Sequence, residues 1–391
     1  MNYQFPVINH IDDVLPAIAD SKEFVVARRD WGTVINYLVS TPDTFPDVND
    51  TLSAIRRECR GLLFYPDGRV MSRRLHKFFN LNERNETQLS QVDLSQPHVI
   101  LDKLDGSMIT PIYTIAGIRW GTKMGLTHVA LQAEEYAAAH SEYSQLATYC
   151  KEQQLTPIFE WCSRQQRIVV DYPEDRMVLI AVRMNHSGEY ISYSELTALG
   201  EQYNIEVVKT YPGTLHSMSQ LVEQSSSLED AEGWILRFDN GHMLKVKGEW
   251  YLRIHRIKEL ITLEKNVVDL IVNDKLDDVK PFVLDDDRHR LEEFERRFWQ
   301  GFNIAVETYD RYWNSVQAAG MDRKAYAQNW MPTVQKNDPF AAQFVFGKFN
   351  GKDSRQMLLD QIRKNTGTAT KIDAVRHLWT GVIWSYHYDQ D

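Results

Sequence analysis

The sequence predicts an α+β protein in which a region of antiparallel sheet is followed by a helical region. From Glu23 to about Lys247, short segments rich in β-branched and aromatic residues alternate with Gly, Pro, Asp and Asn, which is the pattern of strands joined by turns. After Tyr251 such segments almost disappear, and apolar residues recur at steps of three and four, as an amphipathic helix requires. The length of 391 residues favours two domains, because single cores stop growing beyond about 250–300 residues.

The expected strands of the first region are bounded by turn-forming residues. In chain order they are 23–30, 33–40, 61–73, 98–104, 108–122, 156–161, 167–172, 177–184, 233–238 and 242–248. Asp67-Gly68 and Asn240-Gly241 are dipeptides typical of hairpin turns. Helical periodicity interrupts this pattern at 129–153 and 194–203, so the region mixes antiparallel sheet with helices.

Three segments in the remainder of the chain have helical periodicity, at 287–319, 354–365 and 371–379. The first also has acidic residues near its start, where they interact favourably with the helix dipole. The sequence therefore predicts one domain over residues 1–255 and an all-α domain over residues 256–391.

Composition excludes several classes of protein. The net charge of −10 argues against nonspecific coating of nucleic acid, which depends on clustered Lys and Arg. Cys59, Cys150 and Cys162 are too few and too scattered for a disulfide framework or a zinc site. No apolar run is long enough to span a bilayer, and the N-terminus lacks the pattern of a signal peptide. We expect a cytoplasmic protein without a membrane partner.

The motif Lys-x-Asp-Gly-Ser, at residues 103–107, is the first candidate for chemistry. On its own it is also compatible with an exposed lysine at the end of a strand, followed by a turn. Its surroundings favour a functional role, because cations and carboxylates recur on short segments before and after it. They are Arg60, Lys77, Lys123, Glu160, Glu232, Lys245 and Lys247. Lys245 and Lys247 are two residues apart on an expected strand, so both point to one face.

These segments resemble the ordered motifs of the covalent nucleotidyltransferases, the ATP-dependent ligases and capping enzymes. The chain is more closely similar to the RNA ligase 1 family of T-even-like bacteriophages, through RECRG, KFFNLNE, FEW, GEYISY and the helical C-terminal region. The resemblance covers nearly the whole chain. It implies a nucleotidyltransferase domain followed by a helical domain that selects RNA, in the host-cell cytoplasm if the protein is phage-encoded. One departure is that the strand at 179–183 has no aromatic residue where related enzymes often stack the adenine.

The implied reaction is the ATP-dependent joining of a 5′-phosphate to a 3′-hydroxyl of RNA, through lysyl-AMP and RNA-adenylate intermediates. Lys103 would be the nucleophile, since a lysine made neutral by burial or by nearby cations can attack the ATP α-phosphate. Lys245 and Lys247 would stabilise the charge that develops on that phosphate. Asp105 would fix the turn and the direction from which the lysine approaches.

The remaining ATP contacts follow from the resemblance. It places Arg60, Lys77 and Lys123 around the phosphates of ATP or the incoming 5′-phosphate, and Glu160 at the ribose hydroxyl or a metal-bound water. Tyr37 and Tyr251 are further ATP-binding candidates. Taken singly, each of these residues is also compatible with an ordinary strand position.

A divalent metal is expected beside ATP, with Mg²⁺ as the natural ion and Mn²⁺ able to substitute. Magnesium prefers oxygen ligands and reaches phosphate largely through water. Glu232 suits a metal-orienting role, and the resemblance adds Glu160 and Asp277. Asp277 lies in an acidic run that a solvated helix start would also explain.

Two other functions share these motifs. A DNA ligase or capping enzyme usually continues with an oligonucleotide-binding β-barrel, whereas this chain continues with helices. A catalytically inactive RNA-binding protein would be expected to lose an irreplaceable residue such as Lys103. We therefore favour an RNA ligase, acting as a monomer on a tRNA with a broken anticodon loop.

From Arg323 onward there are 10 basic and 6 acidic residues. The candidate phosphate contacts are Lys348, Lys352, Arg355, Arg363, Lys364 and Lys371.

Overall fold

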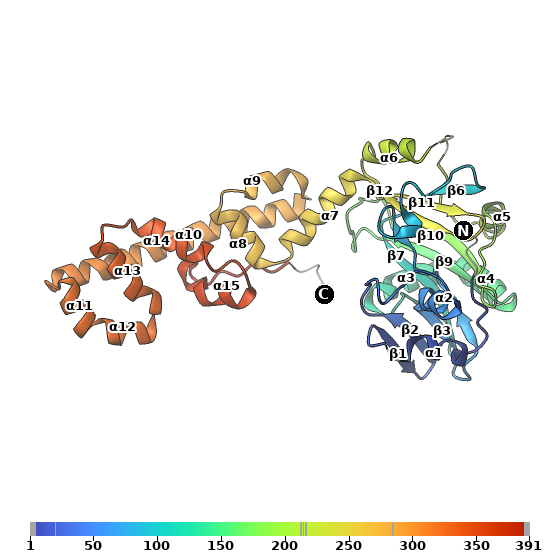
Figure 1. Ribbon diagram of the computed structural model, residues 1–391, viewed down its shortest axis with the longest axis horizontal. Coiled ribbons are helices and arrows are strands. Elements are labelled where there is room, and N and C mark those ends of the chain that lie inside the picture. The colour runs from blue at the N-terminus through green and yellow to red at the C-terminus, as the bar shows by residue number, and fades with distance from the viewer. Residues whose placement is uncertain are drawn as a thin grey trace. The chain divides into compact units, whose positions relative to one another are not determined.

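The predicted α+β class is confirmed by the computed structural model, which describes residues 5–386 apart from 20, 212, 214, 216 and 284 (Figure 1). The chain divides into two compact units, residues 1–252 and residues 253–391. The strands belong to the first unit, and the second unit is helical. Within the described ranges, no helix combines the length and the apolar character needed to cross a bilayer.

The described part of the first unit contains three four-stranded sheets. The first has the order β1-β2-β3-β4, with β1 Phe24–Arg29, β2 Gly32–Tyr37, β3 Arg60–Phe64 and β4 Val70–Ser72. The second has the order β10-β9-β7-β8, with β7 Ser107–Thr114, β8 Gly117–Gly121, β9 Leu155–Cys162 and β10 Arg176–Met184. The third has the order β5-β12-β11-β6, with β5 Phe79–Asn80, β6 His98–Asp102, β11 Gly233–Phe238 and β12 Met243–Lys247. All pairings are antiparallel except that of β12 with β5.

The helices of the first unit pack beside these sheets. They are α1 Leu15–Ile18, α2 Thr51–Glu58, α3 His128–Ala139, α4 Ser141–Glu152, α5 Tyr193–Tyr203 and α6 Met218–Ser226, with 3-10 helices at Ile11–Asp13 and Asn85–Thr87. Ala130, Ala133 and Ala137 form a buried stripe at helical spacing on α3, which contacts β8. The single helical stretch expected at 129–153 is divided into α3 and α4 at His140, whose backbone is not helical.

The prediction of a strand at 167–172 is wrong, because these residues form a loop between β9 and β10. The backbone N–H groups of Val169 and Val170 donate to the Asp105 carboxylate, at 2.7 and 2.8 Å, and not to a neighbouring strand. The two valines are nevertheless buried. Their apolar, β-branched character reflects this burial, which in a sequence is easily mistaken for a strand.

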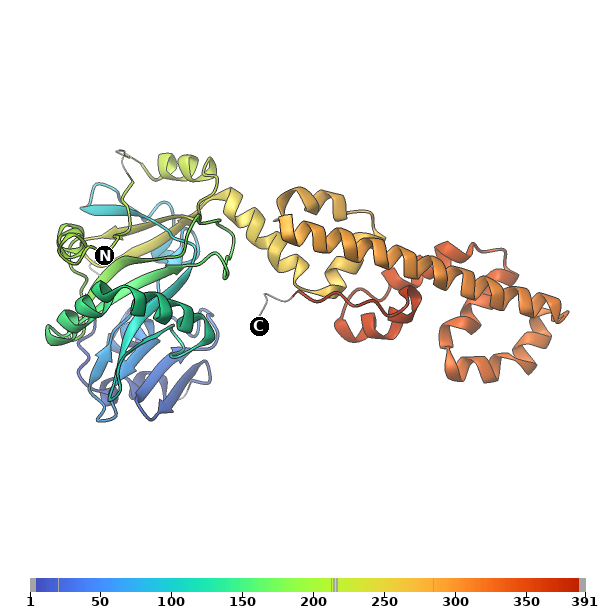
Figure 2. The same cartoon turned by 180° about the vertical axis from the view of Figure 1, so that it is seen from behind.

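The second unit is organised along the long helix α10, Asp285–Ala318 (Figure 2). Phe294, Phe298 and Phe302 lie on its buried side at steps of four and pack against the shorter helices. Those helices are α7 Glu249–Ile261, which begins in the first unit, α8 Glu264–Val272, α9 Leu276–Val279, α11 Arg323–Asn329, α12 Met331–Asn337, α13 Pro339–Phe349, α14 Ser354–Arg363 and α15 Ala369–Val375, with 3-10 helices at Lys280–Phe282 and Arg376–Trp379.

A buried ion cluster ties the sheets of the first unit together. The Glu58 carboxylate, at the end of α2, accepts from Arg73 Nε at 2.9 Å and from Arg183 Nη1 at 2.8 Å, and all three side chains are inaccessible to solvent. Arg73 follows β4 and Arg183 lies on β10, so one carboxylate connects the first and second sheets. Burial alone would raise the pKa of Glu58, but Arg183 and Arg73 lower it to about 2.

We expect Glu58→Gln to destabilise the first unit by about 3–5 kcal/mol, because the substitution leaves two buried guanidinium groups without a counter-charge. Urea unfolding followed by circular dichroism measures the difference. Asp67→Asn is the control, since Asp67 pairs with Arg69 on the surface and its loss should cost less than about 1 kcal/mol.

The same cluster gives a pH dependence with a defined sign. The pKa of Glu58 is lower in the folded chain than in the unfolded chain, so its contribution to stability is complete above the unfolded pKa and is lost as the pH falls toward about 2. Between pH 4.5 and 2, the unfolding free energy of Glu58→Gln should fall less steeply with pH than that of the wild type. Parallel slopes would contradict the assignment.

Candidate active site

Lys103 lies directly after β6, where the pairing of β6 with β11 places it beside Glu232 and Gly233. The Lys103 backbone N–H donates to the Gly233 carbonyl at 2.9 Å. Its Nζ lies 2.5 Å from Glu232 Oε2, and Lys247 Nζ lies 2.9 Å from Glu232 Oε1. The Glu232 side chain is 4 % exposed, so this carboxylate holds two lysines in a region with little solvent. Lys103 is 18 % exposed and therefore remains accessible from the cavity.

The Asp105 side chain, 4 % exposed, holds the turn of the motif. Its Oδ2 accepts from Val169 and Val170, and its Oδ1 accepts from the Tyr251 hydroxyl at 2.8 Å. The Asp105 N–H donates to the Tyr172 hydroxyl at 2.8 Å. One carboxylate thus joins the motif, the loop after β9 and the first turn of α7. Tyr251, a predicted ATP contact, lies against this turn.

Glycines permit the close approach of the strands around Lys103. A Cβ at Gly106 would lie 2.3 Å from the Trp161 carbonyl oxygen on β9. At Gly233, which has φ +138°, a Cβ would lie 2.1 Å from the Val246 carbonyl oxygen on β12. Larger residues would force these strands apart.

The pair Lys245 and Lys247 lies on one face of β12, as the two-residue period predicts. Their surroundings differ, however. Lys247 is paired with Glu232 and lies 5.0 Å from the centre of the Tyr251 ring, whereas Lys245 lines the cavity and lies 4.9 Å from the centre of the Phe78 ring. Burial, together with Arg60 and Lys103, holds the pKa of Lys245 well below its usual value.

Three further cations surround Tyr37, which is on β2. Lys77 Nζ and Lys123 Nζ lie 5.1 and 5.0 Å from the centre of its ring, and Arg60 is at the start of β3. Burial raises the pKa of the Tyr37 hydroxyl, but Arg60, Lys77 and Lys123 together bring it below its usual value. The predicted group of Arg60, Lys77, Lys123 and Tyr37 is therefore brought together as a cluster of positive charge around a phenol.

Arg74 is a residue of this site that sequence reasoning missed. Its guanidinium is buried and donates to Thr110 Oγ1 at 2.7 Å and to the carbonyls of Thr122 at 2.5 Å and Gly121 at 3.3 Å. Burial, with a smaller effect of Arg60, lowers its pKa to about 9. Arg74 thus holds the turn that presents Lys123. Nothing in the sequence distinguishes it from an exposed arginine.

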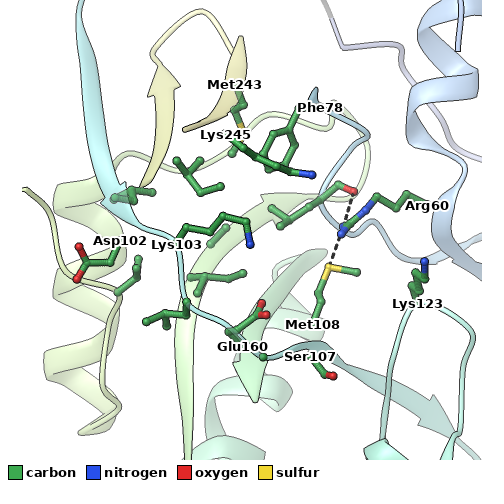
Figure 3. A pocket seen from close by; sticks show the side chains of 18 of the residues that line it. Arg60, Phe78, Asp102, Lys103, Ser107, Met108, Lys123, Glu160, Met243 and Lys245 are labelled. Atoms are coloured by element: carbon green, nitrogen blue, oxygen red, sulfur yellow. Dashed lines mark hydrogen bonds between the residues drawn. The ribbon is translucent and has the colours of Figure 1, made fainter. Parts of the chain in front are cut away.

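Some of these side chains line a cavity of about 370 Å³ between the second and third sheets (Figure 3), whereas Tyr37, Lys77, Glu232, Lys247 and Tyr251 lie outside its lining. The charged lining residues include Arg60, Lys103, Lys123, Glu160 and Lys245. Another part of the wall is aliphatic and comprises Leu101, Leu104, Ile180, Ala181, Val208 and Ile235. The pairing of β10 with β9 is irregular between Leu179 and Ala181, and Ile180 at this irregularity lines the cavity. A charged region beside an apolar one suits a nucleotide, with its phosphates and its base.

Glu160, on β9, lines the same cavity near Lys103 (Figure 3). Burial raises its pKa to about 7, although the positive charge of Lys103 opposes the shift. Glu160 and Glu232 supply carboxylate oxygens of the kind that Mg²⁺ prefers. Among the described residues, however, no three His, Cys, Asp or Glu side chains are clustered as a metal site. Asp277 belongs to the second unit, on α9, where it pairs with Lys280 at 2.8 Å.

Comparisons with known proteins give one family. The family model described as RNA ligase matches residues 58–251, and the model of the T4 RNA ligase 1 C-terminal domain matches residues 258–371. A putative RNA ligase of Thermovibrio ammonificans is 28% identical over 284 residues, covering 69% of this chain and 70% of that protein. RNA ligase 1 of bacteriophage TS2126 is 24% identical over 389 residues, covering 95% of this chain and 93% of that protein. The solved structure of an archaeal ATP-dependent RNA ligase has a TM-score of 0.44 and 14% identity, covering 72% of this chain and 74% of that one.

The two family models follow one another along the chain, and the first spans the segments that line the cavity, from Arg60 to Lys245. The relative from TS2126 extends over almost the full length of both proteins. The chain therefore belongs to the RNA ligase 1 family and is an RNA ligase.

Proposed function

We propose that this RNA ligase uses ATP and joins a 5′-phosphate to a 3′-hydroxyl, with Lys103 as the nucleophile. The observation that carries the proposal is the position of Lys103, whose Nζ opens onto the cavity and is held by the buried Glu232 carboxylate at 2.5 Å. Lys245, Arg60 and Lys123 line the same cavity. These cations are suited to bind a negatively charged triphosphate. The low dielectric of a buried site strengthens the attraction between the cations and the phosphates.

The reaction would occur in three displacements at phosphorus. Neutral Lys103 Nζ attacks the α-phosphorus of ATP, so that a P–N bond forms, the bond to pyrophosphate breaks and the lysine proton is lost. An oxygen of the RNA 5′-phosphate then attacks the lysyl-AMP, and the P–N bond breaks as Lys103 takes up a proton. In the last step, the 3′-hydroxyl of the other RNA end attacks the RNA-adenylate, and AMP leaves. The covalent lysyl-AMP thus divides the difficult joining of the two RNA ends into successive, easier displacements at phosphorus.

Lys103 and Glu232 form an ion pair in the structure, and the amine must leave this pair and lose its proton before it can attack phosphorus. We infer that ATP binding with a divalent cation separates the pair, because Glu232 would then orient the hydrated ion while Lys103 turns to the α-phosphate. A divalent cation would supply positive charge at the phosphates. Glu160 would contact the ribose hydroxyl or a water on that cation.

The substrate is also part of the proposal. We propose RNA with a break in a loop, as in a tRNA with a nicked anticodon loop, sealed by a monomer with Mg²⁺, or Mn²⁺ in its place. The family membership supports an RNA substrate, and the second unit, which includes Asp277, would select it. Ligation of a panel of linear RNA, nicked stem-loop RNA and DNA tests this choice, and equal sealing of all three would contradict it.

Lys103→Ala and Lys103→Arg should abolish formation of enzyme-AMP, because alanine has no nucleophile and arginine stays protonated. Incubation with α-labelled ATP and Mg²⁺, followed by denaturing gel electrophoresis, measures the label on the protein. Sealing of RNA that is already adenylylated should persist in the Ala variant, since Lys103 is not consumed in that step. A labelled Lys103→Ala protein would refute the assignment.

Lys245→Gln and Lys247→Gln should each slow enzyme-AMP formation by about two to three powers of ten, the usual scale for losing a preorganised charge at a phosphate. Single-turnover kinetics at several ATP concentrations measures the effect. Lys22→Gln is the matched control, because Lys22 is exposed in the same unit. Rates within twofold of the wild type for both variants would show that these lysines do not contact the reacting phosphate.

The second unit offers a separate test through its exposed lysines. Lys352, Lys364 and Lys371 are exposed, whereas Lys348 and Arg363 bond to Ser354 and to the Val272 carbonyl. Replacing the three exposed lysines with Ala should weaken RNA binding and reduce the dependence of log K on log salt by up to about 3, while enzyme-AMP formation is unchanged. An unchanged salt dependence, measured by fluorescence anisotropy, would exclude this surface as the RNA contact.

A further inference from the structure

Arg237 lies at the end of the cavity that is away from Lys103. It is on β11, on the same face as Gly233 and Ile235, because side chains two residues apart share a face. Gly233 accepts the N–H of Lys103, and Arg237 follows four residues later, roughly 13 Å along the strand. Its partner across the strand pair is Met243 on β12, and both side chains line the cavity.

The Arg237 guanidinium is buried without a matching acceptor. The residue is 6 % exposed, and its Nη1 is buried and has no hydrogen-bond partner. Among the described residues that line the cavity, Arg237 alone has a buried side-chain nitrogen or oxygen without a hydrogen-bond partner. Its Cζ lies 6.0 Å from the centre of the Tyr190 ring, at the outer limit of a cation–π contact. Burial lowers the pKa of Arg237, so the fold holds this charge at a cost.

A buried charged donor without a partner costs stability, and beside a cavity a bound ligand is one way in which the charge of such a group is satisfied. The cavity wall between Lys103 and Arg237 is aliphatic, with Ile180, Val208 and Ile235. Such surfaces pack against the two faces of a purine ring but do not distinguish the atoms at its edge. A hydrogen-bond donor in the plane of the ring is needed for that distinction.

We propose that Arg237 recognises the nucleobase of ATP by donating a hydrogen bond from its guanidinium to a ring nitrogen of the adenine. This inference rests on the proposed use of ATP and deepens it. The α-phosphate lies beside Lys103, the ribose follows along β11 past Ile235, which is paired with Lys245 on β12, and the base reaches Arg237 between aliphatic side chains. Arg237 thus supplies specificity that the strand at 179–183, without an aromatic residue, does not.

The test combines a substitution at Arg237 with changes of single atoms in ATP. Arg237→Met removes the donor and keeps an apolar side chain of similar length. Enzyme-AMP formation is measured with ATP and with 1-deaza-, 3-deaza- and 7-deaza-ATP, each of which replaces one ring nitrogen with CH. For the wild type, one of the three analogues should have a KM about ten- to a hundredfold above that of ATP, the scale for losing a bond to a charged group.

In Arg237→Met the KM for ATP should rise by the same factor, and that analogue should no longer differ from ATP. The melting temperature should not fall, because the substitution removes an unsatisfied buried charge. Arg237→Lys should recover part of the discrimination. Arg28→Met, which makes the same substitution at an exposed arginine of β1 outside the cavity, should keep the wild-type pattern.

The proposal is overturned if Arg237→Met keeps the wild-type KM for ATP. It is also overturned if the discrimination among the three analogues is the same in both proteins, since Arg237 would then act only through the fold. A wild-type enzyme that forms no enzyme-AMP with ATP would instead overturn the proposed function, and this inference with it. The reaction of the wild-type enzyme with ATP therefore distinguishes failure of the proposed function from failure of the role proposed for Arg237.

Discussion

The site depends on the register in which β11 pairs with β6 on one side and β12 on the other. In this register Trp234 is opposite Asp102 and Gly233 is opposite Lys247, so that Lys103, Glu232 and Lys247 come together at one end of the sheet. A slip of one residue would turn every side chain of the shifted strand to the other face. The apolar face opposes such a slip, because Trp234, Leu236 and Phe238 would leave the core that they form with Ile100 and Leu244.

The charges inside the first unit fall into two kinds. Glu58 is fully compensated by Arg73 and Arg183, and Asp105 is compensated by backbone N–H groups and the Tyr251 hydroxyl. These groups hold sheets, loop and helix in place. The cavity, by contrast, has more cations than carboxylates among its lining side chains. The fixed groups thus keep like charges close together. Burial, together with these neighbouring charges, lowers the pKa of Lys245 and prepares the site for a polyanion.

Arg74 and Arg237 show two uses of a buried guanidinium without a carboxylate partner. Arg74 donates to two carbonyls and a hydroxyl, so its charge is spread over the turn that presents Lys123. Arg237 lines the cavity, and its Nη1 is buried without a partner. A buried charge without a counter-charge is less favourable for stability than an apolar core, and such sites are typical of places where binding has been favoured over stability.

The α+β class, most of the strands and the candidate residues of the site follow from the amino-acid sequence alone, because these features depend on local patterns. Turn residues bound the strands, the two-residue period places Lys245 and Lys247 on one face, and the Lys-x-Asp-Gly-Ser motif marks Lys103. The roles of these residues in catalysis stay predictions. Which groups meet is seen only in the folded chain. Glu232 pairs with both Lys103 and Lys247, Asp105 accepts hydrogen bonds from the loop at 167–172, and Arg74 and Arg237 are buried. Glu232 is 129 residues from Lys103, and Val169 is 64 residues from Asp105. Contacts over such separations depend on how the sheets pack, which no local pattern of residues encodes.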